Sequence, residues 1–234
     1  MAKSPNGQIH GWGEHLQGYV NVPVVNKAMG GRSARSFTEE GRFREVAALV
    51  TAGDVLIVEL GHNDQGSLSS QGEDLGKVPC AGSGNETCKS TVNGRPVIVR
   101  TFPAYLIDAG NAFVAKGGKV VFSSMTPNNI CESGRCTYTP SRFTYFTKQA
   151  AQTVGHGSTF VDHGLYTAKA YQALGAAKVN SFFPFSNKEG GRDHTHTSDP
   201  GAMAVANAFV KAVLCANDPN LMPLLKYHSQ DGAC

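Results

Sequence analysis

Asp193 and His196 lie three residues apart in the run Asp193–Ser198, which directly precedes a predicted helix. In nucleophilic hydrolysis, such an imidazole acts as general base, while the carboxylate fixes its tautomer and stabilises the imidazolium. The alternative is a surface histidine in a polar loop. The spacing predicts two members of a Ser-His-Asp triad, here called the Asp193–His196 dyad, and raises the question of which serine they serve.

Two further loops carry groups that could stabilise a negatively charged oxygen. Asn63, in the run 61–64 after a strand-like segment, could donate its side-chain amide. Gly31, in Gly30-Gly31, could donate its backbone N–H, because glycine permits close approach. Taken singly, each motif is more simply a turn. Together with the dyad, the two loops predict an oxyanion hole.

The same region suggests a metal site as a second chemistry. His62, Asp64, Asp193, His194 and His196 all carry side chains that can bind metals. The His-x-His spacing at 194–196 brings two imidazoles together on an extended segment. No third ligand is fixed by the spacing, so we rank a metal-dependent hydrolase behind the triad.

Composition sets the class of protein. The chain has 234 residues, of which 41% are hydrophobic and 17% charged, and this favours one globular domain over residues 1–234. The net charge of +3, without a Lys/Arg run, argues against nucleic acid or a membrane surface as partner. No apolar stretch reaches the length of a transmembrane helix. No signal peptide is visible, since residues 1–20 are polar and Gly-rich.

The six cysteines nevertheless indicate a secreted protein. They fall into three close pairs: Cys80/Cys88, Cys131/Cys136 and Cys215/Cys234. Six cysteines allow 15 pairings, and free buried thiols are the alternative; we favour these local pairs as disulfides formed in an oxidising compartment. Asn85-Glu86-Thr87 is a glycosylation sequon inside the first pair. A secreted character thus occurs without a visible secretion signal.

Apolar runs alternate with helical patterns along the chain. The expected strands lie at residues 20–26, 55–60, 120–122 and 159–161, and the expected helices at 43–50, 102–116, 143–154 and from Ser198 onward. This alternation predicts an α/β fold with a parallel sheet between helices, and residues 65–100 read as a long Gly/Ser-rich excursion. Ligands of such sheets bind beyond the carboxyl ends of the strands, where the polar loops emerge.

Five motifs in family order give the chain a resemblance to a known family. They are residues 11–16, 31–36, 61–64, 126–129 and 193–198. With them the chain resembles the SGNH (GDSL-type) hydrolases, and within these the fungal rhamnogalacturonan acetylesterases. The combination spans nearly the whole chain and is specific, although each motif alone is not.

The resemblance implies a three-layer α/β/α sandwich with a five-stranded parallel sheet. It also implies a secreted serine esterase that removes acetyl groups from pectic polysaccharide without a cofactor. By position, Gly31 and Asn63 would be oxyanion donors, Asp193 the orienting acid and His196 the base. Cys80–Cys88 and Cys215–Cys234 resemble family disulfides, whereas Cys131–Cys136 resembles an addition. Acetylated xylan or another pectin stays open as substrate, and we expect a monomer.

The chain departs from the family pattern in two places. Residues 186–192 are a longer segment than expected, which could reshape the rim of a cleft. The family opens with a strand and a Gly-Asp-Ser-Thr turn that carries the nucleophile, and Met1-Ala2-Lys3 resembles the residues that come after that turn. We expect Ser4 to be no substitute, because no strand precedes it to place it.

We therefore expect the chain as given to lack its first strand and its nucleophile, and to be inactive by itself. The hypothesis is a fragment assigned to an internal methionine; an upstream in-frame stop without a Gly-Asp-Ser codon run would contradict it. The alternative functions are a non-catalytic carbohydrate-binding relative and, behind it, the metal-dependent hydrolase.

Overall fold

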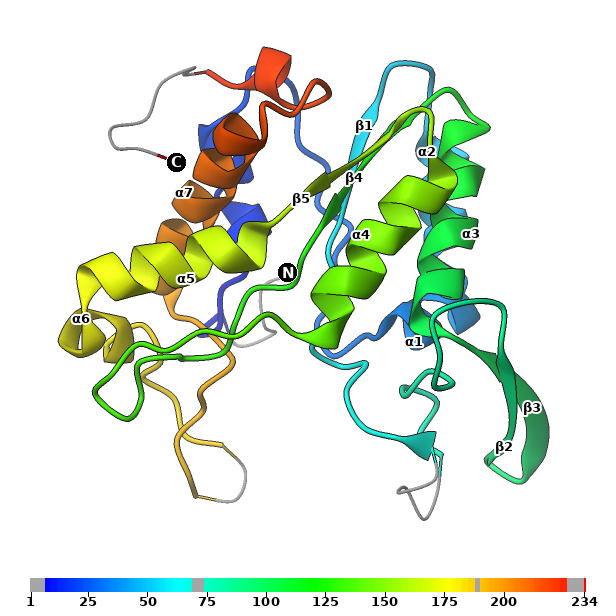
Figure 1. Ribbon diagram of the computed structural model, residues 1–234, viewed down its shortest axis with the longest axis horizontal. Helices are drawn as coiled ribbons and strands as arrows, with labels where there is room; N and C mark the ends of the chain where they lie inside the picture. Colours follow the sequence, from blue (N-terminus) through cyan, green and yellow to red (C-terminus); the bar gives the residue numbers. More distant parts are fainter. Residues whose placement is uncertain (1–6, 69–73, 188–189, 227–233) are drawn as a thin grey trace. The chain divides into compact units, whose positions relative to one another are not determined.

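The computed structural model describes residues 7–68, 74–187, 190–226 and 234, which form two compact units (Figure 1). Unit 1 contains Met1–Gly30, Thr126–Pro140 and Val161–Cys234, and unit 2 contains Gly31–Met125 and Ser141–Phe160. The expectation of one domain over residues 1–234 stays a prediction. The expectations for Met1–Lys3 and Ser4 lie outside the described residues.

A parallel sheet of three strands runs through unit 2, in the order β1 (Val55–Val58), β4 (Lys119–Ser123) and β5 (Ser158–Val161). β1 pairs with β4 from Val55↔Lys119 to Val58↔Phe122. The central strand β4 is buried from its second residue onward, as its continuous apolar sequence predicts. The mixed α/β class with a parallel sheet is thus confirmed, whereas five strands stay a prediction.

The strand expected at residues 20–26 is wrong. Only Val20 makes a bridge, which is antiparallel to Leu225. Pro23 has no N–H to donate to a ladder, and the N–H of Val24 donates instead to the side chain of Gln17 (2.9 Å). This segment therefore runs as irregular chain within unit 1.

Four helices pack in unit 2: α1 (Ala34–Glu39), α2 (Arg42–Leu49), α3 (Phe102–Val114) and α4 (Arg142–Val154). α3 begins at the N-cap Thr101, has Pro103 in its first turn, and packs against α4. Gly110 permits this packing, because a Cβ there would lie 2.8 Å from Val154 and 2.9 Å from Phe122.

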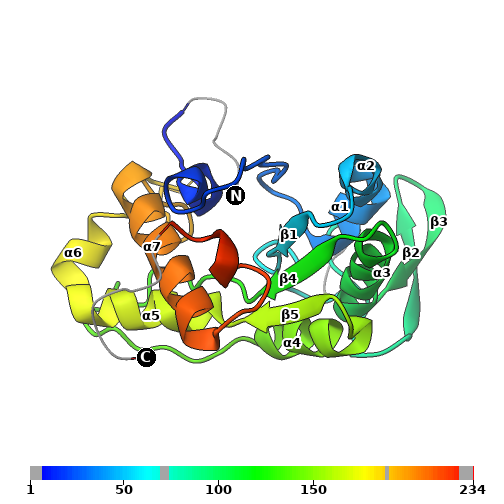
Figure 2. The ribbon, with the colours of Figure 1, turned by 90° about the horizontal axis from the view of Figure 1, so that it is seen from above.

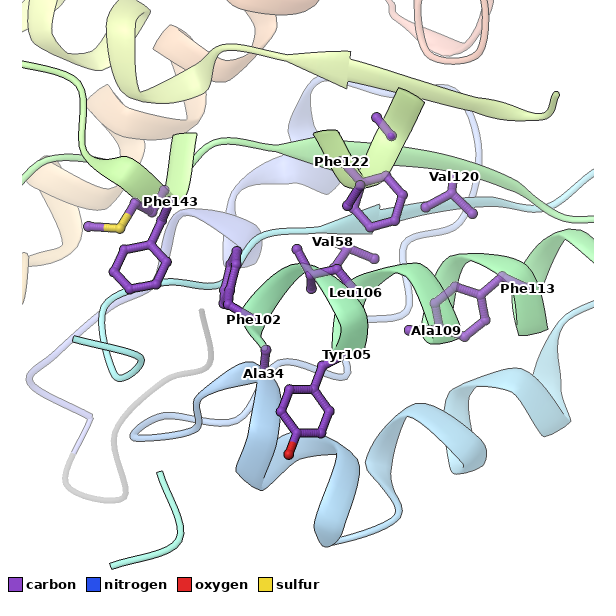
Figure 3. Close-up of a cluster of buried hydrophobic side chains, with 13 residues drawn as sticks. Ala34, Val58, Phe102, Tyr105, Leu106, Ala109, Phe113, Val120, Phe122 and Phe143 are labelled. Atoms are coloured by element: carbon purple, nitrogen blue, oxygen red, sulfur yellow. The ribbon is translucent and has the colours of Figure 1, made fainter. Parts of the chain in front are cut away.

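The core of unit 2 is an aromatic and aliphatic cluster beneath these helices (Figure 3). Phe102 from α3 meets Phe143 from α4 edge to face, with ring centroids 4.8 Å apart. Phe122 of β4 and Phe113 of α3 are almost fully buried in the same cluster. Burial of rings of this size is a main source of the stability of this unit.

The excursion at residues 65–100 contains an antiparallel hairpin that the sequence analysis missed. β2 (Thr87–Val92) pairs with β3 (Arg95–Arg100) across a turn at Asn93-Gly94. Both turn residues have positive φ, 50° and 74°, as a two-residue type I′ turn requires. The Asn-Gly pair between β-prone runs was the available signal. The Cys80–Cys88 disulfide ties the hairpin to the preceding loop, as predicted.

Unit 1 is built around α5 (His163–Leu174) and α7 (Asp199–Ala216), which pack together and are seen from above in Figure 2. Trp12 stacks on Phe209 of α7 and meets His163 of α5 edge to face. The shorter elements are η1 (Trp12–Glu14), η2 (Leu16–Gly18), α6 (Ala176–Asn180) and η4 (Met222–Leu224).

The two remaining predicted disulfides, Cys131–Cys136 and Cys215–Cys234, are present in unit 1. None of the helices in the described parts of the chain is long and apolar enough to cross a membrane.

Candidate active site

The Asp193–His196 dyad forms in unit 1 as its spacing predicts. His196 Nδ1 lies 2.7 Å from Asp193 Oδ2. The other carboxylate oxygen, Oδ1, accepts the backbone N–H groups of Thr195 (2.8 Å) and His196 (2.9 Å). The Asp193 carboxylate thus organises its own turn and orients the ring that follows, which is how an Asx turn positions a side chain.

Hydrogen bonds also set the charge of Asp193. Burial alone would raise its pKa, but the N–H groups of His196 and Thr195 and the His196 ring lower the pKa of Asp193 below its ordinary value. The Asp193 side chain is 14% exposed and the His196 side chain 44%. The carboxylate is therefore ionised at neutral pH, and the imidazole is open to a bound molecule.

Backbone contacts with three other segments fix the loop that carries the dyad. Asp193 N–H donates to the carbonyl of Phe185 (3.0 Å), and Ser198 N–H donates to that of Phe182 (2.8 Å). Thr197 exchanges two bonds with His10: its carbonyl accepts the His10 N–H (3.0 Å), and its Oγ1 donates to the His10 carbonyl (3.0 Å).

On the other side of the same loop, Asn129 N–H donates to the carbonyl of His194 (2.7 Å). Asn129 lies in the motif 126–129, so this motif supports the dyad loop. Hydrogen bonds to three other segments of unit 1 thus fix the conformation of the loop that carries the dyad.

The first turn of α7 supports this loop by close packing. A Cβ on Gly201 would lie 2.8 Å from Phe182 Cβ and 3.1 Å from Thr197 Cβ. Only a residue without a side chain allows the helix to approach Thr197, the neighbour of His196, so closely. Gly201 is thus a positioning residue, and no sequence pattern marked it as one.

The predicted oxyanion donors both lie in unit 2, on loops that are joined to each other. Gly31 is exposed with φ +76°, and Asn63 is partly buried in the turn after β1. Asp64 joins the two loops, because its Oδ1 accepts the backbone N–H of Ala34 (2.8 Å), three residues after Gly31. Their roles as oxyanion donors stay predictions.

Asp64 is completely buried, and its environment is unusual for a carboxylate. Its Oδ2 has no hydrogen-bond partner among the described residues. Burial raises the pKa of Asp64 to about 7, although the backbone of Ala34 and Gly61 acts in the opposite direction. From the sequence, Asp64 was expected only as a metal ligand. Its structural role depends on tertiary burial, which the residue pattern does not reveal.

The segment after Gly31 is also anchored by a fully buried arginine. Arg35 Nη1 contacts both carboxylate oxygens of Asp74 (3.0 and 2.9 Å) and the carbonyl of Val78 (3.0 Å), and its Nε donates to Glu39 (2.8 Å). Removing either partner of such a buried pair leaves an uncompensated charge, so the pair fixes the conformation of α1.

No donor set for the metal-dependent alternative is found. Throughout the described ranges, no group of three or more His, Cys, Asp or Glu side chains could hold a metal ion. His194 lies 3.8 Å from Glu132, and both side chains are largely exposed. Asn85, the predicted glycosylation site, is exposed beside β2, and its modification stays a prediction.

The longer segment at residues 186–192 closes on itself. Ser186 and Arg192 form an antiparallel bridge, and Asn187 N–H donates to the carbonyl of Gly191 (2.7 Å). This small loop directly precedes Asp193. Its effect on substrate preference stays a prediction.

Comparison with characterised proteins gives the class. The chain is 47% identical over 224 residues to the rhamnogalacturonan acetylesterase of Emericella nidulans, across 96% of this chain and 86% of that protein. It is 27% identical over 213 residues to the rhamnogalacturonan acetylesterase RhgT of Bacillus subtilis, across 87% of this chain and 80% of the relative. No protein-family model matches the sequence.

Among solved structures, the protein YXIM of Bacillus subtilis has a similar fold, with a TM-score of 0.66 and 18% identity. The match covers 91% of this chain and 52% of that one, so the chain spans about half its length. The motifs and the α/β fold define an SGNH hydrolase. Within that class, the chain belongs to the rhamnogalacturonan acetylesterase family.

Proposed function

We propose that this protein removes O-acetyl groups from acetylated pectic polysaccharide outside the cell. The observation that carries the proposal is the hydrogen-bonded dyad of Asp193 and His196 in a chain 47% identical to a rhamnogalacturonan acetylesterase. The three disulfides support function in an oxidising compartment.

The dyad suits His196 to act as general base. A carboxylate 2.7 Å from Nδ1 keeps the proton on that nitrogen, so Nε2 of the neutral ring carries the lone pair. Nε2 takes the proton of an attacking hydroxyl, and Asp193 stabilises the imidazolium that forms. The ring then returns the proton to the sugar oxygen as the acetyl C–O bond breaks, and a water molecule repeats the cycle on the acetyl-enzyme.

The oxyanion of each tetrahedral intermediate needs N–H donors. We assign this role to the backbone N–H of Gly31 and the side-chain amide of Asn63, as the family resemblance implies. Asp64 supports the assignment, because its bond to Ala34 keeps both loops in one arrangement within unit 2. Removing one such donor typically costs about 10²- to 10³-fold in kcat.

The nucleophile is expected in a Gly-Asp-Ser segment, and this expectation stays a prediction. The assay therefore uses two proteins: residues 1–234, and the same residues preceded by the N-terminal segment of the Emericella nidulans relative. We expect the extended protein to release acetate from acetylated rhamnogalacturonan, and residues 1–234 alone serve as the comparison.

Three comparisons make the assay specific. Acetylated xylan tests the polysaccharide, and the extended protein should release acetate faster from the pectic substrate. His196→Ala should abolish release, whereas His156→Ala, which changes an exposed histidine of unit 2, should leave it intact. Binding of the polysaccharide without acetate release by the extended protein would instead identify a non-catalytic carbohydrate-binding relative.

A further inference from the structure

A hollow of about 440 Å³ lies within unit 2, beside the loop that carries Asn63. Its volume lies in the range of roughly 300 to 1,000 Å³ that is typical of small-molecule sites. Gly66, Ser67 and Leu68 line it and lie two to four residues after the 61–64 turn in sequence. The other lining residues come from the loop 79–82, from β2, from the start of α3 and from α4.

The charged groups of the hollow are two cations. Lys89 of β2 and Arg142 of α4 line it, and none of the described residues in its lining is Asp or Glu. Both side chains are exposed. The Lys89 ammonium has no hydrogen-bond or ion-pair partner among the described residues, so its charge is available to a ligand.

Arg142 is held in place, yet it keeps free donors. Its Nη2 donates to the carbonyl of Gly66 (3.1 Å), and the guanidinium lies 5.1 Å from the centroid of the Phe143 ring. These contacts join α4 to the loop beyond Asn63. A guanidinium has five N–H groups, and its planar fork matches a carboxylate, so the remaining N–H groups can bind one.

Neighbouring carboxylates are already engaged. Asp74, which accepts the hydroxyl of Ser90 in the lining, is paired with the buried Arg35. Glu86, whose carboxylate lies against Gly82 of the wall, accepts the N–H of Gly84 (2.7 Å). Among the described residues, neither carboxylate pairs with Lys89 or Arg142. Asp74 is balanced by Arg35, so the two cations of the lining outnumber the one charged carboxylate beside it, that of Glu86.

The rest of the lining is apolar and aromatic. Phe102, Phe143 and Phe146 all contribute to it, and Phe146 is the one of the three that is only partly buried. The C–H face of a pyranose ring can bury apolar surface against such a ring, while its polar groups point to the rim.

From this combination we propose that the hollow binds a uronate residue of the polysaccharide, with its carboxylate on Lys89 and Arg142. The inference rests on the proposed function, since a galacturonan backbone supplies the acidic sugar. The site would select acidic over neutral acetylated polysaccharides, and it would place the chain beside the loop of Asn63.

Binding is measured by calorimetry on residues 1–234, which requires no catalysis. The probes are a deacetylated rhamnogalacturonan oligosaccharide and the same oligosaccharide with its carboxylates reduced to alcohols. Lys89→Gln and Arg142→Gln should each weaken binding of the acidic probe about fivefold, the scale of one exposed ion pair. Binding of the reduced probe should not change, and added salt should weaken only the acidic probe.

Two matched variants control for net charge. Arg95→Gln lies on the same hairpin and Lys148→Gln on the same helix, and neither residue lines the hollow. Both should bind the acidic probe as the unmodified chain does. Equal losses in these controls, equal binding of the two probes, or no binding of the acidic probe would overturn the proposal.

The extended protein separates this inference from the proposed function. Lys89→Gln should raise KM for the polysaccharide about fivefold and leave hydrolysis of p-nitrophenyl acetate, which carries no carboxylate, unchanged. Loss of acetate release in every form would refute the esterase proposal, whereas the calorimetric comparison would still decide whether the hollow binds uronate.

Discussion

Two aspartates, one in each unit, occupy opposite environments. Asp193 is partly exposed, accepts two backbone N–H groups and holds the His196 ring, and its pKa lies below the ordinary value. Asp64 is fully buried, accepts the N–H of Ala34, has an unpartnered oxygen and has a pKa of about 7. The same residue type thus orients a base in one loop and, in the other, connects two loops through a buried hydrogen bond.

The difference teaches that burial and hydrogen-bond donors together decide whether a carboxylate is used as a charge: burial prevails at Asp64, and the donors prevail at the less buried Asp193. Asp193 has enough donors to remain ionised beside an imidazole, as a catalytic dyad requires. Asp64 has too few hydrogen-bond donors to offset its burial, so its protonated form is favoured in the folded state. Four substitutions test this contrast.

The largest expected effect comes from Asp193→Asn. The amide keeps an oxygen for the Thr195 and His196 N–H groups but presents NH₂ to Nδ1, which favours the wrong tautomer. We expect kcat of the extended protein to fall by about 10⁴-fold. The free energy of unfolding at neutral pH should fall as well, because the lowered pKa of Asp193 means that its ionised form stabilises the folded state. Steady-state acetate release measures kcat, and urea titration measures the free energy of unfolding. A loss below tenfold would contradict the role of Asp193.

Gly61→Ala tests the loop of Asp64. Gly61 has φ +142°, and a Cβ there would lie 2.5 Å from Met125 Sδ. Backbone strain and overpacking together should cost about 4 kcal/mol of stability. Gly30→Ala, where a Cβ has open space, is the control. Equal unfolding free energies for the two variants would show that the turn is less constrained than its geometry indicates.

Asp64→Asn tests the raised pKa. A carboxyl group whose pKa is raised in the folded state stabilises that state fully at pH values below its unfolded-state pKa. For Asp64, this contribution to the stability of the folded state is lost as the pH rises through about 7. Between pH 4 and pH 8, the unmodified protein should therefore lose on the order of 3 kcal/mol relative to Asp64→Asn. Urea unfolding at both pH values measures it. Parallel pH dependence in the two proteins would mean that Asp64 ionises normally.

Gly201→Ala perturbs the dyad loop by packing alone. The added methyl group pushes on Thr197 and Phe182, so we expect a loss of about 2 kcal/mol of stability. A displacement of His196 on the order of 1 Å would lower kcat about 10²-fold. Gly18→Ala, in open space in the same unit, should change neither quantity. An unchanged kcat in Gly201→Ala would show that α7 does not position the dyad.

Much of the fold could be predicted because its signals are local. The apolar run 120–122 of β4 and the N-cap position Ser198 of α7 mark their elements directly. The strand at 20–26 failed because Pro23 removes a donor and Gln17 satisfies the N–H of Val24.

The hairpin of β2 and β3 was missed although Asn93-Gly94 signals it, because its flanking residues lack a clear apolar alternation. α5 and α6 were also missed, since their apolar residues do not follow a strong helical period.

In the candidate site too, local contacts could be predicted from the sequence and long-range contacts could not. Asp193 and His196 are neighbours in sequence, so spacing alone predicted their contact. Three other features could not be predicted in this way. The hydrogen bond from Ala34 to Asp64 and the ion pair of Arg35 with Asp74 join residues that are distant in sequence. The role of Gly201 depends on how closely α7 packs against Thr197 and Phe182. Such roles follow from burial, which the pattern of residue types does not determine.

The most direct test of the central claim is chemical rescue of His196→Ala in the extended protein. If His196 is the general base, the variant should lose nearly all acetate release from acetylated rhamnogalacturonan, and added imidazole should restore a measurable part of it. His156→Ala should be fully active with or without imidazole. Undiminished acetate release by His196→Ala would contradict the claim.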